Sequence, residues 1–114
     1  MTALPVWFDV DKCFIDGRWI APASGQTLAV EDPSRGVEIG AIARGGPEDI
    51  DAAVKAAERA LAGPWGRLTA TERGRLLAKL SELIRARADD LARIEAIDVG
   101  KPLKQARADA LAMA

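Results

Sequence analysis

Histidine and asparagine are absent from this sequence, and cysteine occurs once, as Cys13. Without histidine the chain lacks the commonest general base and metal ligand, and without asparagine it lacks a common oxyanion donor. Cys13 lies in a strand-like run, DKCFID, with no base to activate it, so we interpret it as a small buried hydrophobe. A single cysteine also excludes an intramolecular disulfide and is typical of a reducing, cytoplasmic setting.

The chain has no excess charge of one sign and no long apolar run. The net charge is −1 at pH 7, which provides no general attraction to nucleic acid or to an anionic membrane. Trp19 and Trp65 lie beside turn residues without a basic groove, so we interpret them as packing anchors. No stretch approaches the ~18 apolar residues of a membrane span, and no signal-like start is present. We expect a soluble, cytoplasmic protein that binds neither nucleic acid nor membrane.

The pair Gly100-Lys101, in AIDVGKPLKQA, is the nearest approach to a phosphate-binding loop. Such a loop has a glycine five positions before its Gly-Lys pair and a serine or threonine after it. This chain has Glu95 and Pro102 at those positions, and it contains no G-x-G-x-x-G, C-x-x-C or G-x-S-x-G pattern. We therefore predict that Gly100 ends a helix, a role that accounts for the glycine without any bound ligand.

Turn residues and apolar spacing predict strands up to about residue 44. The run CFIDGRWIAP flanks Asp16-Gly17, and two further short runs flank a turn at residues 32–36. The simplest arrangement is one small antiparallel sheet, although Asp16-Gly17 also suits a tight hairpin of its own.

From residue 46 the apolar spacing becomes helical and predicts three or four helices. Pro47 begins the first, Thr69 caps the second, a break near residues 88–90 separates the third, and Pro102 precedes a fourth. Apolar residues line one face of each of the first two helices, and the face of the second must pack on something; the residues are Ile50, Ala53, Val54, Ala57 and Leu61, and Leu76, Leu77, Leu80, Leu83 and Ile84. So few strands leave these faces without enough cover, which is typical of part of a larger domain.

The acidic residues near the end of the chain allow two interpretations. Asp89-Asp90 and the pair of Glu95 and Asp98 suit acid–base or metal chemistry, but exposed helix faces commonly carry such charges for solvation alone. We favour the solvated face on residue pattern alone.

Five segments in order closely resemble the N-terminal portion of the aldehyde dehydrogenase superfamily. They are FIDGRW, DPSRG, DIDAAVKAA, PW followed by RGRLL, and IDVGKP, and the resemblance covers about residues 14–114. It implies an α/β fold, in which a small antiparallel sheet and three to four helices form part of a Rossmann-type cofactor domain. On this reading residues 1–114 are a partial cofactor-binding domain, with a leader at 1–13, strands and turns at 14–44 and helices at 46–114.

The resemblance also implies a function. Members oxidise small-molecule aldehydes to carboxylic acids with NAD or NADP through a cysteine thioester, and they are usually dimers or tetramers. Their catalytic and nucleotide-binding residues lie beyond the matched segment, so we assign none here, and Cys13 is not the family nucleophile. We expect the chain alone to be inactive. The alternative is a truncated, non-catalytic helical interaction module from the same family, whose open apolar face binds a partner.

One family feature falls inside the chain. Many members bind a structural monovalent cation through backbone carbonyls that, by position, are those of Val30 and Glu31, together with the Asp98 carboxylate. A further carbonyl comes from downstream. Oxygen ligands suit a hard cation. Asp98 equally suits a local cap or hydrogen bond.

Overall fold

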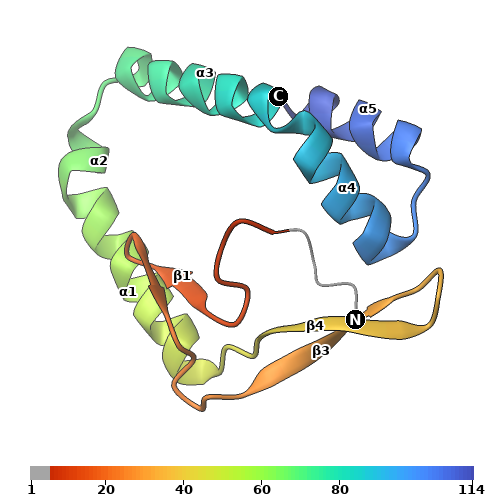
Figure 1. Ribbon diagram of the computed structural model, residues 1–114. Coiled ribbons are helices and arrows are strands. Elements are labelled where there is room, and N and C mark those ends of the chain that lie inside the picture. The colour runs from red at the N-terminus through yellow and green to blue at the C-terminus, as the bar shows by residue number, and fades with distance from the viewer. Residues whose placement is uncertain (1–5) are drawn as a thin grey trace. The chain divides into compact units, whose positions relative to one another are not determined.

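The computed structural model describes residues 6–114 (Figure 1). The first five residues of the expected leader lie outside the described residues. The rest forms two compact units. The first, called here the N-terminal unit, comprises residues 6–30 and 40–68, and the second, the C-terminal unit, comprises residues 31–39 and 69–114.

The N-terminal unit begins with a tight hairpin of β1 (Cys13–Ile15) and β2 (Arg18–Ile20). The two strands are antiparallel, and Phe14 lies opposite Trp19. Asp16 and Gly17 connect them with φ values of 55° and 73°, the left-handed pair that matches the twist of a two-residue hairpin. Asp16-Gly17 therefore closes a hairpin of its own, and the described strands form two sheets instead of one.

The second sheet pairs β3 (Thr27–Asp32) with β4 (Val37–Ala43). The turn between them depends on Asp32, whose carboxylate accepts hydrogen bonds from the Ser34 backbone N–H at 2.8 Å and from Arg35 Nε at 2.7 Å. Ile39, on β4, is 2% exposed and is the largest fully buried side chain among the described residues.

Helix α1 (Pro47–Ala62) begins where the sequence predicts, with Pro47 in its first turn and Gly63 as its C-terminal cap. Asp49 is buried and accepts hydrogen bonds from the backbone N–H groups of Gly46, at 2.8 Å, and Ala23, at 3.0 Å. The helix contacts β1 and the short helix α2 (Pro64–Arg67), which the sequence analysis did not predict.

The expected apolar face of α1 is not buried among the described residues. Ile50, Val54 and Leu61 are exposed, whereas Ala56 on the same helix is buried. The small alanine side chain allows the helix to approach its neighbours closely, and the larger apolar residues are left without cover, as expected from the small number of strands.

Helix α3 (Ala70–Ala86) begins with the predicted capping box. The Glu72 backbone N–H donates to Thr69 Oγ1 at 3.3 Å, and the Glu72 carboxylate accepts from the Thr69 backbone N–H at 2.8 Å. The break after this helix falls at Arg87, slightly before the predicted position, because the Arg87 backbone N–H closes a tighter turn onto the Ile84 carbonyl.

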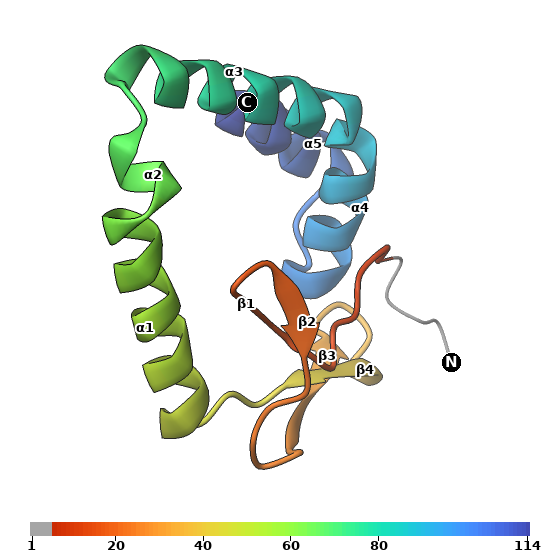
Figure 2. The same cartoon turned by 90° about the vertical axis from the view of Figure 1, so that its left-hand side faces the viewer.

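Helices α4 (Ala88–Val99) and α5 (Leu103–Met113) pack side by side, and α5 also contacts α3 (Figure 2). The α5 helix confirms the fourth helix that Pro102 predicts. No helix in residues 6–114 is long and apolar enough to cross a membrane. Alanines form the contact between the helices, whereas the predicted leucine face of α3 is exposed; the buried residues are Ala88, Ala92, Ala106 and Ala110, and the exposed ones are Leu76, Leu77, Leu80 and Leu83.

Candidate functional site

Two turns of the C-terminal unit meet at Gly100. This residue caps α4 in the left-handed conformation, with φ 70° and ψ 21°, which confirms that it ends the helix. A Cβ atom at this position would lie 3.1 Å from the Ser34 hydroxyl oxygen and 3.3 Å from Cγ of Pro33. Glycine is therefore required here both for its backbone conformation and for the close approach of the turn after β3.

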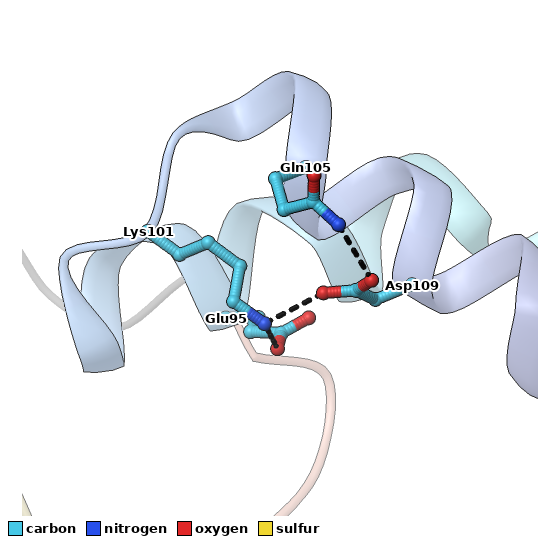
Figure 3. Close-up of polar contacts among 4 residues, drawn as sticks. All are labelled: Glu95, Lys101, Gln105 and Asp109. Carbon is cyan, nitrogen blue, oxygen red and sulfur yellow. Dashed lines mark hydrogen bonds and ion pairs between the residues drawn. The ribbon is translucent and has the colours of Figure 1, made fainter.

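Lys101, the next residue, joins the two helices on either side of the turn (Figure 3). Its Nζ donates to Glu95 Oε1 on α4 at 2.5 Å and to Asp109 Oδ2 on α5 at 2.7 Å. Gln105 Nε2 donates to the other oxygen of Asp109 at 2.9 Å. We call these four residues the Lys101 clamp.

The clamp holds its charges in place at neutral pH. Hydrogen bonds to Asp109 and then Glu95 raise the pKa of Lys101 above its usual value. The hydrogen bond from Lys101, followed by that from Gln105, lowers the pKa of Asp109. The lysine of the Gly-Lys pair is thus engaged with carboxylates of its own chain, which agrees with the interpretation that this pair is not a phosphate-binding loop.

A shallow pocket of about 370 Å³ lies beside the clamp, between α4 and α5. Its walls are mainly apolar, and acidic side chains form part of its lining. The lining residues are Leu91, Ile94, Glu95, Asp98, Asp109, Ala110 and Met113.

Asp98, the predicted cation ligand, differs from the other acidic residues of α4. Glu95 pairs with Lys101, Asp89 lies 2.7 Å from Arg107, and Asp90 lies 3.7 Å from Arg87. Asp98 is exposed, and within the described part of the chain its side chain has no hydrogen bond or ion pair, so the local cap considered for it is not formed. It also lies in the last turn of α4, where no basic residue offsets the negative end of the helix dipole.

The other two predicted ligands lie in β3. Val30 is half-buried and belongs to the N-terminal unit, whereas Glu31 is exposed and belongs to the C-terminal unit with Asp98. The contact of Gly100 with Pro33 and Ser34 joins the turn that follows Glu31 to the turn that follows Asp98. Among residues 6–114 no three His, Cys, Asp or Glu side chains converge on a point that suits a metal ion.

Cys13 and Trp19, which the sequence analysis singled out, lie among packed side chains and backbone of the N-terminal unit. Cys13 is half-buried, and its Sγ lies 3.5 Å from the position of a Cβ atom on Gly45. Trp19 stacks on Phe8 with ring centroids 5.6 Å apart and contacts Phe14 at 4.9 Å, which confirms a packing role. The sequence analysis missed the Lys101 clamp, because Asp109 lies on a separate helix and no local spacing connects it to Lys101.

Comparisons with known proteins concern the sequence and the fold as a whole. Residues 19–114 match the profile of the aldehyde dehydrogenase family. Betaine aldehyde dehydrogenase of Bacillus subtilis is 40% identical over 97 residues, which cover 84% of this chain and 20% of that protein. The crystal structure of a candidate aldehyde dehydrogenase from Burkholderia cenocepacia superposes with a TM-score of 0.87 and 54% identity, covering 89% of this chain and 21% of that one.

A third relative was solved with the nucleotide bound. The NAD⁺ complex of aldehyde dehydrogenase from Bacillus cereus superposes with a TM-score of 0.86 and 37% identity over 91% of this chain and 21% of that one. The fold and sequence together define a segment of a dehydrogenase. The chain belongs to the aldehyde dehydrogenase family, corresponds to its N-terminal portion, and spans about a fifth of the length of the relatives it matches.

Proposed function

We propose that this chain is the N-terminal segment of an NAD(P)-dependent aldehyde dehydrogenase. The observation that carries the proposal is the family match over residues 19–114, supported by the TM-score of 0.86 to a relative solved with NAD⁺. The two units then form part of the cofactor-binding domain of the complete enzyme. That enzyme is a homo-oligomer, as the resemblance implies, and is cytoplasmic, as the single cysteine suggests.

The proposed reaction converts a small aldehyde into a carboxylic acid. A cysteine thiolate adds to the carbonyl carbon, and bound NAD or NADP accepts the hydride. Water then releases the acid from the resulting thioester. The thiolate must be held near a base and an oxyanion donor, and the chain has neither histidine nor asparagine. We therefore place catalysis outside these 114 residues and give this segment a structural role.

A segment exchange tests this proposal. Residues 6–114 replace the matching segment of the Bacillus cereus enzyme, and NADH formation from an aldehyde is measured beside the unmodified enzyme. We expect the chimera to be active and to remain active with Cys13→Ser, because the chain has no histidine to activate Cys13, which lies beside Gly45. A folded but inactive chimera contradicts the proposal, and so does aldehyde oxidation by the purified 114-residue chain.

The proposal includes a structural monovalent cation, held by the carbonyls of Val30 and Glu31, the Asp98 carboxylate and a further carbonyl from downstream. Support comes from Asp98, whose charge has no partner in the described residues and adds to the negative end of α4. Bound K⁺ or Na⁺ offsets that charge, and the oxygen-only donor set suits such an ion. The cation therefore stabilises the contact between the two turns.

A further inference from the structure

The Lys101 clamp lies next in sequence to Gly100, where the two turns of the C-terminal unit come close together. Lys101 directly follows Gly100, and its side chain binds both helices that the turn connects. Its Nζ is held by one carboxylate on α4 and one on α5, so neither helix can rotate about the turn without breaking an ion pair. The lysine thus restrains the chain direction at Gly100.

This restraint matters for Asp98 because Asp98 has no restraint of its own. The side chain is exposed and has no hydrogen-bond partner in residues 6–114, so its position depends on the end of α4. That end is positioned by the contact of Gly100 with Pro33 and Ser34, close in sequence to Glu31.

We propose that Lys101 is a positioning residue for the cation site: its ion pairs with Glu95 and Asp109 hold the Gly100 turn against Pro33 and Ser34, and so fix Asp98 and the Glu31 carbonyl relative to the ion. The inference rests on the cation site of the proposed function and adds a residue that does not touch the ion.

Charge and position predict opposite effects for the loss of Lys101. Lys101→Met removes a positive charge near Asp98. If Lys101 affected the cation by charge alone, the variant would bind the cation more tightly than the wild type. If Lys101 acts by holding the turn, the same substitution weakens binding. Loss of a group that orients metal ligands typically costs 10–100-fold in affinity, so we expect a decrease of about tenfold or more.

The experiment measures cation-dependent stability of the chimera described above, because the rest of that enzyme supplies the downstream carbonyl; the chimera without further substitutions is the wild type here. Urea unfolding is followed in KCl or NaCl and in tetramethylammonium chloride at equal ionic strength, and the salt dependence gives the apparent cation affinity. The variants are Lys101→Met and Lys101→Arg. The matched control is Lys104→Met, which makes the same charge change at an exposed lysine in the first turn of α5 that has no ion pair among the described residues.

The proposal is supported if K⁺ or Na⁺ stabilises the wild type and Lys104→Met, while Lys101→Met loses affinity and Lys101→Arg regains part of it. Equal or tighter binding by Lys101→Met overturns the positioning role and leaves the cation site standing. If no cation stabilises the wild type, the cation site and this inference both fail, whereas family membership and dehydrogenase activity, tested by the chimera, are unaffected. Should Lys101→Met not fold, Lys101→Arg decides: it keeps the positive charge, so a pure charge effect predicts unchanged affinity, whereas the positioning role predicts a partial loss.

Discussion

The Ser34 hydroxyl lies so close to Gly100 that a Cβ atom on residue 100 would be 3.1 Å from its oxygen. The two residues belong to DPSRG and IDVGKP, segments far apart in the sequence that each resemble the aldehyde dehydrogenases separately. In the structure they form one contact. Because the two segments fit so closely, a change in the shape of one should disturb the position of the other.

Gly100→Ala should destabilise the chain. A residue other than glycine in the left-handed region costs about 1–2 kcal/mol, and the new methyl group also meets Ser34 and Pro33. Gly74→Ala is the control, because Gly74 lies within α3 with open space around it and alanine favours a helix by about 0.5–1 kcal/mol. Urea unfolding of both variants should give shifts of opposite sign, and shifts of the same sign would contradict the Gly100 contact.

Thr69→Ala should remove the cap of α3. The Glu72 backbone N–H then loses its acceptor, and the expected loss of stability is about 1 kcal/mol. Thr71→Ala serves as the control, since Thr71 is an exposed residue of the same helix whose side chain makes no hydrogen bond in the described structure. Thermal unfolding followed by circular dichroism compares the two variants, and an equal effect of both would argue against the cap.

Asp49→Ala should destabilise the N-terminal unit by about 1–3 kcal/mol. The buried carboxylate accepts from Gly46 and Ala23, and its removal leaves two backbone N–H groups without an acceptor. Asp51→Ala, on the same helix, breaks only an exposed pair with Lys55 and should change stability by less than about 0.5 kcal/mol. If denaturant unfolding shows similar losses of stability for Asp49→Ala and Asp51→Ala, the hydrogen bonds of Asp49 to Gly46 and Ala23 do not stabilise the unit.

Acid should weaken the turn at Asp32. The hydrogen bond from Arg35, together with that from the Ser34 backbone N–H, lowers the Asp32 pKa in the folded state. In the unfolded chain the pKa of an aspartate is about 3.9. The contribution is therefore complete above the unfolded pKa and is lost as the pH falls through the folded pKa.

Unfolding curves of the wild type and Asp32→Asn check this sign. The wild type should be the more stable at neutral pH, and the gap should narrow below about pH 4. A gap that stays constant down to the acid limit would show that the Asp32 charge does not support the turn.

Exposure predicts very different costs for two apolar residues. Ile39 is 2% exposed, so Ile39→Ala should cost about 2–5 kcal/mol. Leu80 on α3 is 50% exposed, and Leu80→Lys should change stability by at most about 0.5 kcal/mol while reducing the binding of a hydrophobic dye. Equal costs in urea unfolding would mean that the α3 face is buried in solution.

Features that depend on neighbouring residues were predictable. Thr69 and Glu72 satisfy each other within one helical turn, Pro47 suits a first turn, and Asp16-Gly17 suits a two-residue hairpin. The short helix α2 and the position of the break at Arg87 were not predictable. Their signals are weak because a single turn has few hydrogen bonds and no apolar spacing.

The sequence by itself determined where α1, α3 and α5 begin and where α4 ends, because caps and turn residues act through hydrogen bonds and backbone conformations within a few positions. Only the tertiary structure decided which side of each helix is covered. Apolar spacing indicated Leu80 and Val54, yet the buried contacts use Ala92 and Ala106, since small side chains permit the closest approach of two helices. It also decided that Lys101 pairs with Asp109, because that distance depends on how α4 and α5 pack.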